Sequence, residues 1–318
     1  MQHPYDHLIL TGSISIDRIM NFGGSYKDLI QADKLHVLSI SVLIDQLTNS
    51  RGGTAANIAY SLALLGQHPI LLGSIGSDAI AYLDDLNKLG IDTSYTHVSS
   101  LPTPTFTVMT DSQDNQIGGF YPGAMSDISQ LTLEPWYNTN SLIVISANDP
   151  LGMDQLVSEC QDHHLDYVYD VGQQVTNLTV DQLKAGLAQA KILFVNDYEL
   201  GTIIGRTGYT QLELEQMIPL IITTLGAKGT NISGSSLSTP LIIPAVTGIK
   251  VIDPTGAGDS YRAGFLYAYL QGSSLQDCAE LGSTVATYTI EKHGTQTHTF
   301  TLDEVIKTHY SAYERKIL

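Results

Sequence analysis

The chain has 318 residues, of which 43% are hydrophobic, so it is long enough for one large domain with an elaboration or for two domains. Its 32 acidic residues outnumber 15 basic ones, and the resulting net charge of −17 disfavours a nucleic-acid partner because phosphates would be repelled. No apolar stretch approaches the ~18 residues of a membrane helix, and the N-terminal segment lacks the features of a secretion signal. We therefore expect a cytoplasmic protein with no membrane partner, in which Cys160 and Cys278 are buried thiols.

The first part of the chain mixes strand and helix signals. Residues 7–15 form a short apolar run that ends in Gly and Ser, which predicts a buried strand. Between residues 17 and 50 the periodicity is weak, with β-like pieces such as 36–44. A pair of glycines then opens a helical pattern over 51–66 that ends at a glycine. The next predicted elements are a strand at 69–76, a helix at 78–90 and two strands at 103–111 and 115–123.

From residue 141 onward, strands and helices alternate regularly. Strands are predicted at 141–146, 166–172, 191–196 and 220–229, and helices at 152–164, 179–190, 197–205, 211–220, 260–270, 275–292 and 302–315. This alternation predicts an α/β fold with a mostly parallel central sheet and helices on both faces. We assign residues 1–16, 51–102 and 124–318 to that domain. Segments 17–50 and 103–123 do not fit the alternation and are expected to form a small β-rich lid.

Residues 251–265, VIDPTGAGDSYRAGF, carry the strongest chemical signal. Gly256 and Gly258 can adopt backbone conformations that are closed to residues with side chains. Together with the amide of Ala257, their amides would point at an anion bound at the start of the following helix. Asp259 is either a general base beside that anion or simply the cap of the helix. The residues alone leave both interpretations open.

Three other stretches place small or polar residues at strand ends, where sheets of this kind bind ligands. Asn196 and Glu199 stand three apart and would hold Mg²⁺ through water, or would form a helix cap. The segment RGGTAAN (51–57) brings backbone amides and Asn57 toward a hydroxylated ligand, or marks a close strand–helix crossing. The segment TTLGAKG (223–229) offers a glycine turn to an adenine or ribose, or is an ordinary turn.

Taken in their order along the chain, these four stretches resemble the signatures of the ribokinase (PfkB-type) carbohydrate kinase family. The resemblance spans nearly the whole length, and within the family the chain is most similar to bacterial adenosine kinases. Pro254 stands where many members carry Thr, a feature shared with the adenosine kinase-like group, and Tyr261 stands where Phe is frequent. The segments that carry the closer likeness are 11–22, 120–127, 147–150, 170–174, 196–199, 223–229 and 294–296.

The resemblance implies a ribokinase-like fold and ATP-dependent phosphorylation of the 5′-hydroxyl of adenosine, a reaction of purine salvage. Asp259 would accept the proton of that hydroxyl, and the amides of Gly256, Ala257 and Gly258 would bind the transferring phosphoryl group. Mg²⁺ would be held through water by Asn196 and Glu199. The residues that would border ATP are Asn196, Thr223, Gly226 and Gly229.

The resemblance also implies a nucleoside site. Asp17 would bind the two ribose hydroxyls, because a carboxylate accepts two hydrogen bonds from a vicinal diol. Phe106 and Phe120, from the lid strands, would sandwich the base. The remaining contacts would come from Ser13, Ser41, Gly53, Asn57, Gln173 and Gln174. The lid is expected to close over the bound nucleoside, because phosphoryl transfer requires that water be excluded.

Several alternatives stay open. Another sugar or nucleoside kinase, such as a ribokinase or an inosine–guanosine kinase, would share these motifs, although a free sugar gives Phe106 and Phe120 nothing to stack on. A nucleoside-binding protein without catalysis conflicts with the intact Asp259. A nicotinamide dehydrogenase is disfavoured because no dinucleotide fingerprint follows the first strand. Some family members need a monovalent cation such as K⁺ near the glycine-rich loop, and exposed lid edges would suit a homodimer.

Overall fold

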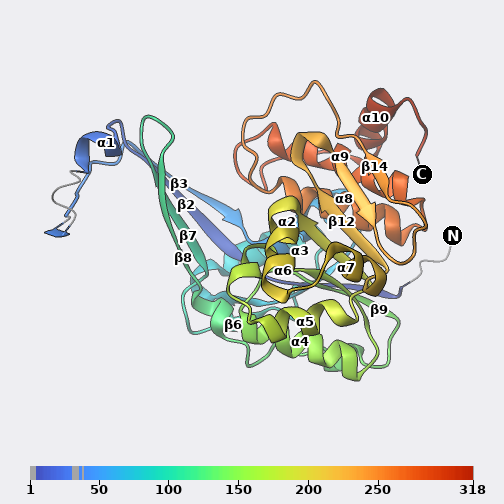
Figure 1. Ribbon diagram of the computed structural model, residues 1–318. Helices are drawn as coiled ribbons and strands as arrows, with labels where there is room; N and C mark the ends of the chain where they lie inside the picture. The colour runs from blue at the N-terminus through green and yellow to red at the C-terminus, as the bar shows by residue number, and fades with distance from the viewer. Residues whose placement is uncertain (1–4, 31–35, 38, 318) are drawn as a thin grey trace.

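The computed structural model describes residues 5–30, 36–37 and 39–317 (Figure 1). Its central sheet has eight strands in the order β14-β13-β12-β11-β10-β9-β1-β4. The strands are β1 His7–Thr11, β4 Ile70–Leu72, β9 Ser141–Ile145, β10 Asp166–Asp170, β11 Ile192–Asn196, β12 Leu220–Thr224, β13 Thr230–Ser233 and β14 Leu241–Ile243. All neighbours from β12 to β4 pair in parallel, whereas β13 and β14 pair antiparallel at one edge. The predicted α/β fold with a mostly parallel sheet is confirmed.

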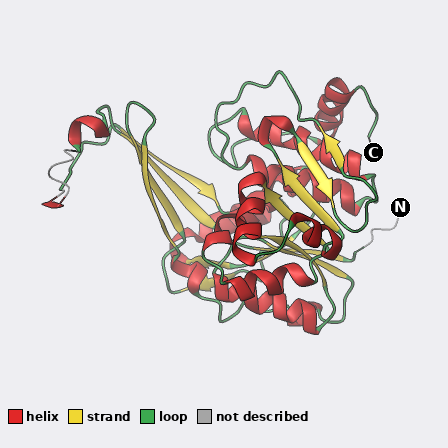
Figure 2. Cartoon of the chain, in the orientation of Figure 1, coloured by secondary structure: helices red, strands yellow, loops and turns green. Residues whose placement is uncertain are grey.

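Helices cover both faces of this sheet (Figure 2), and the alternation of side chains along each strand explains why. Leu8 and Leu10 of β1 belong to one buried cluster, whereas Ile9 belongs to the other. The first cluster includes residues of α2 Thr54–Leu64, α3 Ile80–Lys88, α8 Ala257–Leu270, α9 Leu275–Ile290 and α10 Leu302–Tyr313. The second includes residues of α4 Pro150–Asp162, α5 Val180–Ala188, α6 Asp197–Thr207 and α7 Gln211–Met217.

A second sheet of four strands, in the order β3-β2-β7-β8, projects from the core and carries α1 Tyr26–Leu29 at its far end (Figure 1). We call this sheet the lid. Its strands are β2 Ser15–Asn21, β3 Gln46–Gly52, β7 Thr105–Thr110 and β8 Gln116–Tyr121. A small parallel pair is formed by β5 Ser74–Gly76 and β6 His97–Ser99. Short 3-10 helices are η2 Ser77–Ala79, η3 Gly123–Ser126, η4 Glu134–Trp136, η5 Gly172–Thr176 and η6 Gly226–Lys228.

Two predictions in the N-terminal region are wrong. The apolar run 7–15 is two elements, because the chain leaves the central sheet after Thr11 and enters the lid at Ser15. The β-like piece 36–44 contains no strand in its described residues; the strand is the polar segment Gln46–Gly52 instead. The segment Gln46–Gly52 is a strand because it pairs with β2, and not because its side chains are buried. The apolar piece is not buried either, since Leu43 is 87% exposed.

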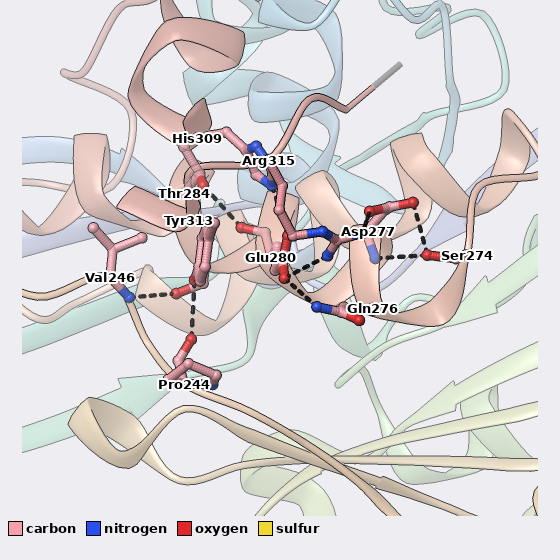
Figure 3. Close-up of polar contacts among 11 residues, drawn as sticks. Pro244, Val246, Ser274, Gln276, Asp277, Glu280, Thr284, His309, Tyr313 and Arg315 are labelled. Atoms are coloured by element: carbon pink, nitrogen blue, oxygen red, sulfur yellow. Dashed lines mark hydrogen bonds and ion pairs between the residues drawn. The ribbon is translucent and has the colours of Figure 1, made fainter. Parts of the chain in front are cut away.

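The C-terminal helix is fastened to α9 by polar contacts (Figure 3). His309 Nε2 on α10 lies 2.9 Å from Glu280 Oε2 on α9, and Arg315 donates to Glu280 Oε1 at 2.8 Å. The hydroxyl of Tyr313 donates to the carbonyl of Pro244 at 2.9 Å and so holds the loop that follows β14. Because α9 packs along α8, this network supports the helix that carries Asp259.

Both cysteines are free and buried, as predicted. Within the part of the chain that the structure describes, no helix combines the length and apolar character needed to cross a bilayer.

Candidate active site

Two cavities are lined in part by residues at the start of α8 or in the loop before it. The inner cavity, of about 530 Å³, opens at the carboxyl ends of β10, β11 and β12, and its lining includes Gln173, Glu199, Gly226, Gly258, Asp259 and Arg262. The lid cavity, of about 580 Å³, lies between the lid and two loops of the core, and its lining includes Ile19, Thr48, Ser50, Asp253, His293 and Gln296. Ligands of doubly wound sheets bind at this end of the strands.

The glycine-rich turn before α8 has a defined geometry. Gly256 is the N-cap residue and adopts a left-handed conformation with φ of 78°. A Cβ atom at this position would lie 2.9 Å from Cγ2 of Thr295, so a side chain is excluded by contact as well as by conformation. The amide of Ala257, predicted to bind an anion, instead donates to the carbonyl of Pro254 at 3.2 Å. The turn therefore uses one of the three predicted anion donors for its own closure.

Asp259 does not cap α8. The cap is Gly256, and Oδ2 of Asp259 accepts a hydrogen bond of 2.8 Å from Nδ2 of Asn57 on α2. Burial raises the pKa of Asp259 to about 6, while the Arg262 guanidinium and the bond from Asn57 act in the opposite direction. A carboxyl group with this pKa is ionised at neutral pH yet basic enough to accept a proton. This geometry removes the helix-cap interpretation of Asp259.

Sequence reasoning missed a buried ion pair next to this group. Nη2 of Arg262 donates to Oδ1 of Asp170 at 2.6 Å, and the hydroxyl of Ser146 donates to the other oxygen at 3.1 Å. Gly258 makes room for the guanidinium, because a Cβ atom there would lie 2.7 Å from Nη1 of Arg262. Two signals were available: an arginine one turn after Asp259 in an otherwise apolar helix, and a carboxylate at a strand end.

Asn196 and Glu199 cap α6 reciprocally. Oδ1 of Asn196 accepts from the amide of Glu199, and Oε2 of Glu199 accepts from the amide of Asn196, both at 2.8 Å. Glu199 is buried but lines the inner cavity, and burial raises its pKa. No cluster of three or more His, Cys, Asp or Glu residues suited to a metal occurs in the described residues. These residues therefore fit an Mg²⁺ ion only through its water shell.

The glycine-pair segment is explained mainly by a close strand–helix crossing. The hydroxyl of Ser13 accepts from the amide of Thr54 at 3.0 Å and so caps the first turn of α2. Gly53 has φ of 98°, and a Cβ atom there would lie 2.4 Å from the carbonyl oxygen of Ser13. Among the candidate residues of segment 51–57, all of which the structure describes, Asn57 is the one that forms a hydrogen bond with Asp259.

The predicted nucleoside residues of the lid form one row across its sheet. Asp17 pairs in register with Ser50 on one side and with Phe106 on the other, and Phe106 pairs with Phe120. Paired residues share a face, and Ser50 of this row lines the lid cavity. Burial raises the pKa of Asp17 to about 6, with Asp253 adding to the effect.

The predicted sandwich of a base between Phe106 and Phe120 stays a prediction. The two residues are direct cross-strand neighbours on β7 and β8. Their side chains are 38% and 44% exposed, so they offer one wall against which a base can lie. The ring of Phe106 leans over Gly118, where a Cβ atom would be 3.2 Å away.

The other predicted contacts are scattered. Gly226 and Gln173 line the inner cavity. Thr223 is buried, and its neighbour Thr224 lines the cavity instead because side chains alternate along β12. Gly229 packs against the carbonyl of Ile243, and Oε1 of Gln174 accepts from Asn177 at 2.9 Å. Ser41 lies exposed in the segment before β3.

The comparisons with known proteins agree with this geometry. The family model of the pfkB family carbohydrate kinases matches residues 16–301. The chain belongs to this family. Its members are kinases that transfer a phosphoryl group to a hydroxyl group, so the protein is a phosphotransferase with an alcohol group as acceptor.

The family relatives include nucleoside kinases. A nucleoside kinase of Methanothermobacter thermautotrophicus is 32% identical over 284 residues, which covers 88% of this chain and 91% of that protein. The structure of Burkholderia thailandensis nucleoside kinase in complex with inosine has a TM-score of 0.86 at 29% identity and covers 98% of this chain and 100% of that one. The Methanocaldococcus jannaschii nucleoside kinase structure has a TM-score of 0.86 at 28% identity, covering 96% and 98%.

Proposed function

We propose that the protein is an ATP-dependent nucleoside kinase that phosphorylates the 5′-hydroxyl of adenosine and yields AMP and ADP. The observation that carries this proposal is the row formed by Asp17, Phe106 and Phe120, which continues into Ser50, a residue that lines the lid cavity. A carboxylate beside an aromatic wall suits a ribose diol attached to a flat base. The names of the relatives support the same acceptor class.

The reaction would take place at Asp259, which lines the inner cavity. In this proposal the nucleoside occupies the lid cavity and the phosphates of ATP occupy the inner cavity. The ionised carboxylate of Asp259 accepts the proton of the 5′-hydroxyl as its oxygen attacks the γ-phosphorus, and ADP leaves. The amides of Gly256 and Gly258 and the positive end of α8 bind the transferred phosphoryl oxygens.

The charges of the inner cavity explain why magnesium would accompany ATP. Its lining holds four carboxylates, Asp170, Asp197, Glu199 and Asp259, and one cation, Arg262. Such a cavity repels free ATP and attracts a divalent ion, and bound Mg²⁺ would neutralise the phosphate oxygens. Glu199 would contact the water shell of this ion, since Asn196 and Glu199 already satisfy each other.

Inosine or guanosine is the second candidate acceptor. The Burkholderia thailandensis relative was solved in complex with inosine. Stacking on Phe106 and Phe120 contacts the face of a base and makes no hydrogen bond to its polar edge. The two rings would therefore accept adenine, hypoxanthine or guanine alike. A ribokinase-like activity remains the alternative for a free sugar.

A turnover panel tests the proposal. Adenosine, inosine, guanosine, ribose and fructose are each supplied with Mg²⁺ and ATP, and ADP release is measured together with the position of the new phosphate. We expect kcat/KM for at least one purine nucleoside to exceed that for ribose by ~10²-fold or more, because stacking and diol binding act together. A higher kcat/KM for ribose than for any nucleoside contradicts the proposal.

A further inference from the structure

A chain of hydrogen bonds connects Asp259 to the base of the lid through Gln296. From Nε2, Gln296 donates to Oδ1 of Asn57 at 2.9 Å and to the hydroxyl of Tyr82. Nδ2 of Asn57 donates in turn to Asp259, and the hydroxyl of Tyr82 donates to the carbonyl of Gly52 at 3.0 Å. Gly52 is the last residue of the lid strand β3. The side-chain amide of Gln296 thus connects Asp259, the proposed general base, to the lid through Asn57 on one side and Tyr82 on the other.

The direction of every bond in this chain is set by its two ends. The carboxylate of Asp259 and the carbonyl of Gly52 can only accept hydrogen bonds. Asn57 must therefore present its NH₂ group to Asp259 and its oxygen to Gln296. Tyr82 uses its single proton on Gly52, so it must accept from Gln296. Position 296 therefore needs a group that can donate two hydrogen bonds, one to Asn57 and one to Tyr82. The NH₂ group of a glutamine provides both donors.

The loop that carries Gln296 is held by hydrogen bonds from the two residues that precede it. The amide of Gly294 donates to Oδ2 of Asp253 at 3.0 Å, and the hydroxyl of Thr295 donates to the carbonyl of Arg51 at 2.9 Å. Tyr82 is 3% exposed and packs in the core cluster of α2. Gln296 therefore has fixed partners on a fixed loop, so its amide is positioned before any substrate binds.

We infer that Gln296 is a positioning residue that orients the Asn57 amide toward Asp259 and ties this orientation to the base of the lid. The inference rests on the proposed role of Asp259 and extends it to a residue in a distant loop. Without Gln296 the Asn57 amide is free to rotate, and its oxygen can face the carboxylate. Asp259 then loses a donor that favours its ionised form.

Other charged groups also face Asp259 and set the background for a pH test. They are Arg262 on the same helix, Asp170 at the end of β10 and Asp17 on the lid strand β2. Glu199 interacts with Arg262 from α6, and Asp253 interacts with Asp17 from the loop before α8. A neutral substitution of Gln296 leaves all of these charged groups in place.

Steady-state kinetics of the full-length protein test the inference with two variants. Gln296→Met removes both donated bonds at similar volume, and Gln296→Glu replaces the donor by an acceptor. We expect kcat to fall about 10-fold for Gln296→Met and about 10²-fold for Gln296→Glu, with KM for ATP unchanged. The acid limb of the kcat profile should move to higher pH by about one unit in Gln296→Glu.

A matched control separates positioning from folding. Gln161 is a remote amide of the same type, which donates to the hydroxyl of Tyr167 and to the carbonyl of Ala185. Gln161→Glu should leave kcat and the pH profile unchanged even if the melting temperature falls. A Gln296→Met variant that keeps the wild-type kcat and pH profile overturns the inference. So does one that changes only the nucleoside KM, since Gln296 would then be a substrate contact.

The proposed function can fail independently of this inference. If the wild-type protein phosphorylates no nucleoside or sugar, or if Asp259→Asn keeps full turnover, the function and the role of Asp259 are wrong. If the wild type is active, Asp259→Asn is inactive and Gln296→Met equals wild type, the inference alone is wrong.

Discussion

Arg262 and Asp170 form an ion pair of 2.6 Å in which both side chains are buried, with Arg262 8% and Asp170 0% exposed. Arg262 follows Asp259 by one helical turn and also interacts with Glu199. One guanidinium therefore balances three carboxyl groups from β10, α6 and α8. In this environment the charge of Arg262 affects both the stability of the fold and the protonation of the proposed base.

Replacing Arg262 with Gln should raise the pKa of Asp259 and destabilise the fold. The loss of the cation leaves Asp170 as a buried, unpaired charge, for which we expect a cost of about 3–5 kcal/mol. The acid limb of kcat/KM, expected near pH 6 in the wild type, should move upward. Urea unfolding and a pH–rate profile provide the two measurements. Arg262→Lys should restore the acid limb in large part, and an unchanged limb in Arg262→Gln contradicts the electrostatic role.

Replacing Asp259 with Asn should lower kcat by ~10²-fold or more, the scale of a lost general base. The amide cannot accept the proton of the attacking hydroxyl at neutral pH. Nucleoside binding, measured by calorimetry, should persist because the lid row is intact. Turnover equal to that of the wild type would remove Asp259 from the mechanism.

The same variant should be more stable than the wild type at high pH. The pKa of Asp259 in the folded protein, about 6, lies above its ordinary value. Its contribution is therefore fully favourable only below the ordinary pKa and is lost as pH rises through 6, by on the order of 2–3 kcal/mol. In chemical unfolding at pH 8, the free energy of unfolding should be larger for Asp259→Asn than for the wild type. This difference should shrink as the pH is lowered toward 4.5.

Asp78 supplies the control of opposite sign for that stability test. Its carboxylate accepts from the amide and the hydroxyl of Thr103 at 2.9 and 2.6 Å, and these bonds lower its pKa. Asp78→Asn should therefore destabilise the protein at pH 8, and the difference from the wild type should shrink as pH falls below the ordinary pKa of Asp. A gain in both variants at pH 8 would point to a general effect of net charge instead.

Gly258→Ala should reduce kcat by displacing Arg262. The new Cβ atom would lie 2.7 Å from Nη1 of the guanidinium, which is closer than contact allows. Gly205 in α6 is the matched control, because a Cβ atom there meets nothing within 4 Å. Gly205→Ala should stabilise the helix by roughly 0.5–1 kcal/mol and keep full activity. Wild-type kcat in Gly258→Ala would show that the guanidinium can move without consequence.

Phe106→Ala should raise the nucleoside KM by about 10-fold, the scale of one lost aromatic contact, and should leave any turnover of ribose unchanged. Ile117 on the neighbouring strand β8 is the control, since it is 53% exposed and points to the other face of the lid. Ile117→Ala should not affect the nucleoside KM. An equal rise of KM for ribose would place Phe106 in a general packing role.

The periodicity of the chain predicted most of the core, because buried parallel strands and amphipathic helices have strong local patterns. The lid was harder to place, since Gln46–Gly52 is polar and exists as a strand through its partners alone. The site divides in the same way. Asp259 was found through its glycine-rich neighbours, whereas Gln296 and Asp170 depend on contacts between distant segments. The roles of Ser13, Ser41, Gln174 and Gly229, the K⁺ requirement and the lid-mediated homodimer stay predictions.

The lid is made of two hairpins, β2–β3 and β7–β8, that leave and re-enter the core at separate points of the chain. Apart from Asp17 on β2, the charged groups that face Asp259 come from neither hairpin. In the proposed function, acceptor choice and phosphoryl transfer are therefore encoded largely in different stretches of sequence. New acceptor preferences can arise by exchange or drift of 15–52 and 105–121, while the acid, its arginine and the glycine turn stay as they are.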